Sequence, residues 1–600
     1  YQHLEELTPA RLQKTLADHR EQAFRNRHLV TIVTDLPIDL DLQCCRTDRL
    51  DWQQPVGLFR DLEFRSLVER LTAPPKTGGA AQQLSFIASP EPPAPATSAE
   101  ANANYETVTT PKGLAALVAR LKPGPFALDT ETDSTDSLQA RLVGISLASG
   151  PGQAAYIPIA HASGQQLPWE LVHRALAPLF ADPEIPKVAQ NAKYDLQILA
   201  RHDLPVQGVA FDTMVAEWLC DPNSKNLGLK NMAWARLGVE MTPIAHLLGV
   251  GRAQVTMDQV PLDQAAAYAA ADADMTLRLV SPLKEELEEK GLLPLYNEVE
   301  LPLVEVLTEM ERNGIGLDVP YLGQMADELQ ERLHSLEARI YDLAGYAFNI
   351  NSPSQLSEAL FDRLGLPKQG LRKTQSGHYS TAADVLERLK GTHPVVDVIL
   401  EHRQVAKIKS TYVEALPALV NSETGRLHTS YNQTGTVTGR LSSSEPNLQN
   451  IPIRTELGRR VRRAFVADRG CLFISADYSQ VELRILAHIS QDRNLLAAFS
   501  RGEDIHASTA AAIYGVPLEG VTSEMRRVAK TVNFAVVYGA SGFGVAQQSE
   551  LSPEEGARFI DAYYRTYPQV RQYIESTKTM AREKGYVQTL LGRHRYFPEL

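Results

Sequence analysis

Two acidic residues at the end of an apolar segment could do chemistry together. In GPFALDTETDS, Phe126 and Leu128 alternate into Asp129 and Glu131. A strand over this segment would present both carboxylates on one face, since side chains alternate between the two faces of a sheet. A lone Asp-x-Glu pair is more often a solvated strand end than a site, so other residues must decide between these interpretations.

Three further residues favour the site. Asp195 falls early in the helical segment VAQNAKYDLQILARH, and Tyr268 and Asp272 lie four apart in the Ala-rich helical segment PLDQAAAYAAADADMTLRLV. That spacing places Tyr268 and Asp272 on one helix face. Four acids that converge without basic partners repel one another unless divalent cations lie among them. Two metals about 3.5–4 Å apart are the usual arrangement for phosphodiester cleavage, and Tyr268 would then position the attacking water.

A second constellation lies at 524–544, EMRRVAKTVNFAVVYGASGFG. At helical spacing one face of about 120° carries two cations and then two aromatic rings. Its members are Arg526, Lys530, Phe534 and Tyr538. Such a face suits a nucleotide, with cations on the phosphates and a ring under the base. A core helix with a polar edge is the alternative. Gly539 and Gly542 are expected to close the helix.

A third group surrounds CLFISADYSQVELRILAHIS. The apolar residues 472–474 predict a buried strand that delivers Asp477 to a cleft as a metal ligand, with Glu482 starting the helix that follows. Arg440 follows a glycine in the polar loop TGTVTGRLSSS, where it can line a nucleic-acid groove. His506 fits a capping or packing role as well as a functional one.

The remaining sequence bounds the class of protein. Six hundred residues suggest three or four domains, and 44% hydrophobic with 22% charged residues is typical of soluble globular proteins. The net charge of −12 argues weakly against a general polyanion binder, although a groove can be locally basic. Four cysteines show neither metal nor disulfide spacing, which fits a reducing cytoplasm. No apolar run predicts a membrane span or secretion, and the lack of a G-x-x-x-x-G-K-[ST] motif excludes a Walker-type NTPase.

The motifs DTET, NAKYD and Y-AAAD, in this order, resemble the three exonuclease motifs of the DnaQ-like, ribonuclease-H-like 3′→5′ proofreading domains. The resemblance implies that Tyr268 orients the water and that four carboxylates bind metal. These are Asp129, Glu131, Asp195 and Asp272. Every one of them is present, so the exonuclease is expected to be active. The implied cofactor is Mg²⁺, two ions per active site, with Mn²⁺ able to substitute.

Residues 290–600 resemble the family A DNA polymerases. DYSQVELR is similar to motif A and RRVAKTVNFAVVYG to motif B, and TGRLSSSEPNLQNIP and EDIHASTA also match family segments. The resemblance implies a catalytic metal ligand in Asp477. It further implies that Arg526, Lys530 and His506 contact the triphosphate. Phe534 would stack near the sugar and base, and Tyr538 would border the nascent base pair. Glu482 would exclude a ribose 2′-OH, and Arg440 would contact the primer-side duplex.

The predicted fold is an α/β multidomain chain. Residues 1–71 resemble the end of a 5′ nuclease domain without its acidic centre, and the Pro-, Ala-, Ser- and Gly-rich residues 72–104 predict a linker. A ribonuclease-H-like exonuclease domain is expected at 105–289 and a right-hand polymerase domain at 290–600. Within it the thumb is placed at about 290–430, the palm at about 431–490 and the fingers at about 491–590.

One expected motif is missing from these residues. The His-Asp-Glu motif C of the family should follow LGRHRYFPEL, and with Tyr1 at the start the chain looks like an interior piece of a longer polymerase. We expect exposed apolar surface and an unpaired sheet edge where palm strands are lacking. The predicted function is template-directed DNA synthesis from dNTPs with 3′→5′ proofreading. The alternative is that only the exonuclease works in this chain and the polymerase half binds primer-template DNA. A monomer in the bacterial cytoplasm, associated with the nucleoid and not with a membrane, is expected.

Overall fold

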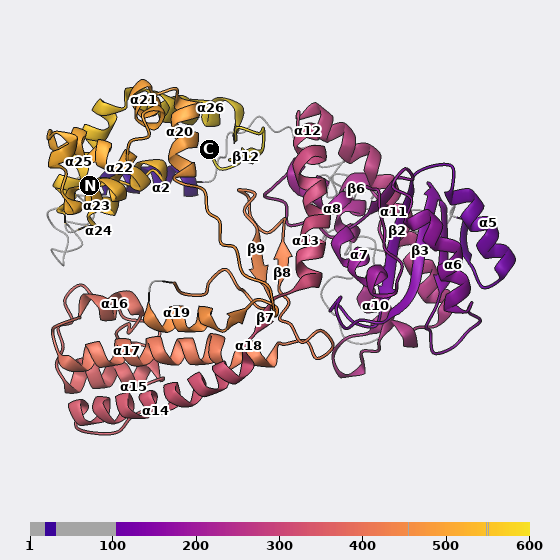
Figure 1. The fold of residues 1–600 in the computed structure, drawn as a ribbon, viewed down its shortest axis with the longest axis horizontal. Coiled ribbons are helices and arrows are strands. Elements are labelled where there is room, and N and C mark those ends of the chain that lie inside the picture. Colours follow the sequence, from indigo (N-terminus) through magenta and orange to yellow (C-terminus); the bar gives the residue numbers. More distant parts are fainter. Residues whose placement is uncertain (1–18, 32–103, 454, 548, 550) are drawn as a thin grey trace. The chain divides into compact units, whose positions relative to one another are not determined.

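The computed structural model describes residues 19–31, 104–453, 455–547, 549 and 551–600 (Figure 1). The chain divides into two compact units, 1–96 and 97–600. In the first unit the described residues contain helix α2 (Arg20–Val30). The predicted nuclease remnant at 1–71 is therefore described only between 19 and 31. The predicted linker at 72–104 lies outside the described residues except for Asn104, the first residue of β1.

A six-stranded sheet forms the core of the second unit's N-terminal part. Its strands, in the order β1-β4-β3-β2-β5-β6, are β1 (Asn104–Thr107), β4 (Gln153–Pro158), β3 (Leu142–Gly150), β2 (Phe126–Thr132), β5 (Lys187–Ala189) and β6 (Val209–Asp212). Strand β2 is antiparallel to β3 and parallel to β5. Because β2 is paired on both edges and buried along most of its length, the alternation of its side chains is fixed.

Helices surround this sheet, some packed on it and others on neighbouring helices (Figure 1). They are α5 (Pro111–Leu121), α6 (Trp169–Phe180), α7 (Ala192–Arg201), α8 (Thr213–Cys220), α9 (Leu229–Met232), α10 (Ile244–Leu248), α11 (Leu262–Glu289) and α12 (Leu293–Leu295). Helix α11 lies against β2, β3 and β4. The small side chains of Ala265, Ala269 and Ala273 are fully buried there, which lets the helix approach the strands closely. The strand predicted through Asp129 and Glu131 and the helices predicted around Asp195 and Tyr268 are thus confirmed.

Long helices follow the sheet. They are α13 (Leu301–Asn313), α14 (Val319–Ala344), α15 (Pro353–Ser357), α16 (Ala383–Arg388), α17 (Pro394–Ile408) and α18 (Ala415–Ala418). Helices α14 and α17 lie side by side (Figure 1) and bury Leu322, Leu329 and Ile399 between them and their neighbours. Burial of each such side chain contributes about 1.5–3 kcal/mol. Strands β8 (Ser430–Asn432) and β9 (Ser442–Ser444) form a hairpin, and β7 (Gly316–Leu317) pairs with β10 (Phe465–Val466).

The C-terminal residues form a separate helical cluster. It contains α20 (Val481–Ser490), α21 (Arg493–Ser500), α22 (Ile505–Tyr514), α23 (Ser523–Val537), α24 (Gly542–Gln547), α25 (Pro553–Thr566) and α26 (Pro568–Lys584), preceded by α19 (Glu456–Arg463) and followed by the hairpin of β11 (Tyr586–Gln588) and β12 (His594–Tyr596). Val528, Val532 and Val536 of α23 point into an apolar core shared with α20, α22 and α25.

Two local predictions are wrong. Residues 472–474 form no strand, and Leu472 and Ile474 are 90% and 93% exposed. No described strand pairs with this segment, and an apolar run becomes a buried strand only beside partners that take its backbone hydrogen bonds. The expected apolar exposure is confirmed, whereas the sheet edge expected there is absent from the described residues.

The second wrong prediction concerns Gly542. Gly539 follows the end of α23 with a φ of 67°, a left-handed conformation that favours glycine. Gly542 does not close this helix but starts α24, where a Cβ would lie 2.6 Å from the backbone nitrogen of Ala557. The absence of a side chain at Gly542 permits α24 and α25 to approach each other closely.

Candidate active site

Three carboxylates meet between the sheet and helix α11. Asp129 and Glu131 stand two residues apart on β2, and Asp272 comes from α11, one turn after Tyr268. One oxygen from each carboxylate lies within 4.8 Å of the others. The strand period of two places Asp129 and Glu131 on one face of β2, and the packing of α11 against β2 brings Asp272 to them.

The side chain of Asp195 is hydrogen-bonded to the same strand, β2. It lies in the first turn of α7, and its Oδ1 accepts hydrogen bonds from the Thr130 backbone N–H at 3.0 Å and the Thr130 hydroxyl at 2.6 Å. Buried Asp212 accepts from the backbone N–H of Ala192 at 2.8 Å, which fixes the start of α7. Asp195 is therefore linked to the cluster through Thr130, the residue between Asp129 and Glu131.

The carboxylates of the cluster repel one another. Burial raises the pKa of Asp129 well above its ordinary value, and the charge of Asp195 raises it further. Burial also raises the pKa of Glu131, with Asp272 as the next cause. Burial raises the pKa of Asp195 to about 7, although hydrogen bonds from Thr130 lower it. Buried oxygen ligands that repel one another fit hard divalent cations such as Mg²⁺ or Mn²⁺.

One cation of the chain touches this site. Lys230 of α9 donates to Asp272 Oδ2 at 2.6 Å, and its Nζ lies 4.0 Å from the centroid of the Tyr268 ring. Sequence reasoning missed Lys230, because a lone lysine in NLGLKNMAWARLG carries no spacing signal. Burial, and then the charge of Asp272, raises the pKa of Tyr268, so its phenol keeps its proton at neutral pH.

The predicted nucleotide-binding residues gather around helix α23. Glu482, in the first turn of α20, accepts a hydrogen bond from the Tyr538 hydroxyl at 2.8 Å, and Arg440 lies 3.5 Å from the same carboxylate. Arg526 donates to Asp504 at 2.7 Å. Lys530 is exposed beside them on α23.

His506 packs against this face. Burial lowers its pKa, its Nδ1 lies 2.9 Å from the Asn533 amide nitrogen, and its ring centroid lies 5.9 Å from that of Phe534. Asp504 caps the helix that begins at Ile505, which holds His506 in place. The structure thus brings together Arg526, His506 and Phe534.

Asp477 stands apart from these residues. It lies in the exposed segment 471–478, which has no regular structure. Among the residues that the structure describes, it forms no hydrogen bond or ion pair. The carboxylate clusters of three or more potential metal ligands found in the described chain do not include it.

Comparisons with known proteins agree with both halves of this description. The family model for the 3′-5′ exonuclease matches residues 105–288, and that for DNA polymerase family A matches residues 319–600. DNA polymerase I of Chloroflexus aurantiacus is 46% identical over 99% of this chain and 65% of its own length. That of Pseudomonas aeruginosa is 42% identical over 98% of this chain and 64% of its own.

A solved structure is also similar to this chain. It is the polymerase domain of Pol1 from M. smegmatis in complex with DNA primer-template and dNTP, at 36% identity, a TM-score of 0.71 and 82% coverage of both chains. The chain belongs to the family A DNA polymerases. It spans about 65% of the length of the first curated relative that it matches.

Family membership confirms the predicted fold class, an exonuclease domain followed by a family A polymerase domain. The predicted boundaries of thumb, palm and fingers and the roles of single site residues stay predictions. No helix among the described residues is long and apolar enough to cross a membrane.

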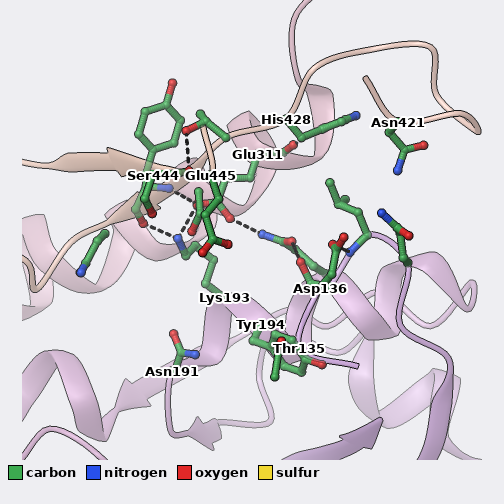
Figure 2. A pocket seen from close by; sticks show the side chains of 18 of the residues that line it. Thr135, Asp136, Asn191, Lys193, Tyr194, Glu311, Asn421, His428, Ser444 and Glu445 are labelled. Atoms are coloured by element: carbon green, nitrogen blue, oxygen red, sulfur yellow. Dashed lines mark hydrogen bonds and ion pairs between the residues drawn. The ribbon is translucent and has the colours of Figure 1, made fainter. Parts of the chain in front are cut away.

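A cleft of about 1020 Å³ lies between the region that matches the exonuclease family model and residues that follow it in this family A chain (Figure 2). Asn191, Lys193 and Tyr194 line it from the region of the exonuclease match. Glu311 of α13 lines it as well, and so does Tyr431 from the region of the polymerase match. The Tyr194 hydroxyl lies 2.5 Å from Thr132 Oγ1 on β2. The lining of the cleft includes no residue of β2, and Tyr194 connects the cleft to that strand by this contact.

Proposed function

We propose that this chain removes nucleotides from the 3′ end of DNA by metal-dependent hydrolysis. The observation that carries the proposal is the convergence of Asp129, Glu131 and Asp272 within 4.8 Å, with Asp195 attached through Thr130. We place Mg²⁺ there, two ions per site, with Mn²⁺ able to substitute. When bound, such ions stabilise the charge on the attacking and leaving oxygens.

The residues of the chain have separate parts in this reaction. The carboxylates would hold the ions and stay deprotonated once they are bound. Tyr268 keeps its phenolic proton, because burial raises its pKa, and it would orient the attacking water through that hydroxyl. The water attacks phosphorus in line with the departing 3′ oxygen, which leaves with a proton. The products are a nucleoside 5′-monophosphate and a primer shorter by one residue.

We further propose template-directed extension of primers from dNTPs, with Asp477 as a metal ligand. The family membership supports this, and a relative's polymerase domain is described with primer-template and dNTP. Arg526, Lys530 and His506 would bind the triphosphate, and Phe534 would stack near the base. Tyr538 and Glu482 would border the nascent pair and the sugar, and Arg440 the primer strand.

A specific observation favours the alternative for this chain. Asp477 is exposed and unpaired among the described residues, whereas the exonuclease cluster is buried and assembled. In this chain, then, the exonuclease would work while the polymerase half binds primer-template DNA. We propose that it acts as a monomer in the bacterial cytoplasm, at the nucleoid.

A labelled primer with one 3′ mismatch tests both proposals. The chain is incubated with a 5′-labelled primer-template and Mg²⁺, with and without the four dNTPs. Shortening of the primer in both conditions supports an active exonuclease and a polymerase half that only binds primer-template DNA. Lengthening past the original end shows that synthesis is complete in this chain. A primer that stays intact, with Asp129→Ala as the matched blank, overturns the exonuclease proposal.

A further inference from the structure

A buried glutamate joins the exonuclease helix α7 to the polymerase region. Glu311, near the end of α13, is 5% exposed and lies in the cleft of Figure 2. Its Oε1 accepts from the Tyr431 backbone N–H at 2.5 Å and forms an ion pair with Lys193. Its Oε2 accepts from the Gln197 amide at 2.5 Å. One carboxylate therefore satisfies three donors from two parts of the chain.

The two side chains from α7 flank a predicted metal ligand. Lys193 and Gln197 stand on either side of Asp195 in sequence, one helical turn apart. Lys193 also donates to the Tyr431 carbonyl. On the other side of the helix, Asp195 is bonded to Thr130 of β2. Helix α7 is thus held between Glu311 and the strand that carries Asp129 and Glu131.

The partner of α7 in this arrangement belongs to the polymerase hairpin. Tyr431 lies in β8, which pairs with β9, and the loop between these strands carries Arg440. The imidazole of His428, just before β8, lies 2.7 Å from the Glu311 backbone carbonyl and fixes the same corner. A displacement of this hairpin would therefore act on α7 through Glu311.

Stability alone explains such an arrangement poorly. A buried ion pair adds little to stability compared with apolar side chains of similar volume, because both charges lose their hydration. What it supplies is geometry, since every donor has one acceptor oxygen in a fixed place. Partners that orient metal ligands commonly change metal affinity about 10–100-fold when they are removed.

We propose that Glu311 is a positioning residue of the exonuclease, which sets helix α7 and with it Asp195 relative to Asp129 and Glu131. This inference rests on the exonuclease proposed above. It makes the metal affinity of the exonuclease site depend on a residue of α13, outside the region that matches the exonuclease family model.

Glu311→Gln tests the inference in the whole chain. A glutamine has one acceptor oxygen, so at least one of the three donors would face its NH₂ group. Exposed Glu309 lies on the same helix, and Glu309→Gln is the matched control. We measure Mn²⁺ binding from the electron paramagnetic resonance signal of free Mn²⁺. We also measure the kcat and KM of the exonuclease on a single-stranded oligonucleotide.

The expected result is Mn²⁺ binding weakened about tenfold and kcat lowered about tenfold in Glu311→Gln, with KM within about twofold. Mn²⁺ affinity and kcat within twofold of Glu309→Gln would overturn the inference. A loss of thermal stability without a change in either quantity would also overturn it, because a purely structural residue gives that result.

A second variant covers the case in which Glu311→Gln does not fold. Gln197→Met keeps the length of the side chain but removes the donor to Oε2, and a smaller effect in the same direction is expected. An unchanged Mn²⁺ affinity in it would then overturn the inference. If the unaltered chain binds Mn²⁺ but shortens no oligonucleotide, the proposed function fails, while the Mn²⁺ comparison still decides the role of Glu311.

Discussion

The two regions of this chain that carry predicted metal ligands differ in how far their surroundings assemble them. Asp129, Glu131 and Asp272 are placed by a strand paired on both edges and by a helix laid against it. Asp477 lies in an exposed segment with no strand around it. In this chain, packed elements hold the first group of carboxylates close together, and none of the described elements does so for Asp477.

The energetic consequence also differs. In the exonuclease cluster, burial and mutual repulsion raise the pKa values of Asp129 and Glu131, so a cation that binds there relieves an existing cost. Asp477 is exposed and belongs to no such cluster among the described residues. The following predictions test that contrast.

The largest effect is expected for the exonuclease carboxylates. Asp129→Ala removes a ligand from the assembled cluster and should lower exonuclease turnover by at least about 10³-fold, since a metal contributes several kcal/mol to the transition state. Asp477→Ala should leave the shortening of a single-stranded oligonucleotide unchanged. Gel assays of the two variants side by side check the contrast, which fails if Asp477→Ala also loses the exonuclease.

The pH dependence of stability should follow the raised pKa values. Asp129 and Asp195 keep their protons to higher pH in the folded chain than in the unfolded chain. At these two carboxylates the folded chain then binds more protons between about pH 4 and 7, so their contribution to stability without metal falls as pH rises through this range. Mg²⁺ should therefore raise the unfolding temperature more at pH 7.5 than at pH 5.5.

Tryptophan fluorescence can follow this unfolding, because Trp169, Trp218 and Trp234 lie in the exonuclease region. Melting in EDTA and in Mg²⁺ at both pH values gives the four temperatures that are needed. A Mg²⁺-induced increase in unfolding temperature that is no larger at pH 7.5 than at pH 5.5 would contradict the prediction.

Lys230 should weaken metal binding. Its ammonium contacts Asp272 and partly neutralises the cluster, so it competes with a divalent cation for the same charge. Lys230→Met is expected to tighten Mn²⁺ binding about fivefold, or about 1 kcal/mol. Exposed Lys225 of the same segment provides the control Lys225→Met. Equal Mn²⁺ affinity in the two variants, measured by equilibrium titration, would show that Lys230 does not compete.

The smallest effect is expected at the nucleotide-binding face. The ion pair of Arg526 and Asp504 joins side chains that are 45% and 40% exposed. Such pairs contribute less than about 1 kcal/mol, so Arg526→Gln should change the free energy of unfolding by no more than about 0.5 kcal/mol. Urea denaturation measures it, and a loss above about 2 kcal/mol would show that this face is built as tightly as the exonuclease site.

The sequence by itself determined the local geometry of both sites. The alternation through Phe126 and Leu128 placed Asp129 and Glu131 on one face, and the spacing of four paired Tyr268 with Asp272. The face of α23 that carries the cations and aromatic rings likewise lies where its helical period predicted it. These features depend on backbone periods of two and 3.6 residues, which neighbouring residues impose.

Only the tertiary structure decided which distant residues complete these sites. Thr130 holds Asp195 across 65 positions of the chain, Lys230 reaches Asp272 across 42, and Glu311 meets Gln197 across 114. The same dependence explains why 472–474 was predicted wrongly as a strand. A period tells which way a side chain points, but the partner that buries it or takes its hydrogen bond is chosen by contacts between distant elements, and no local spacing encodes them.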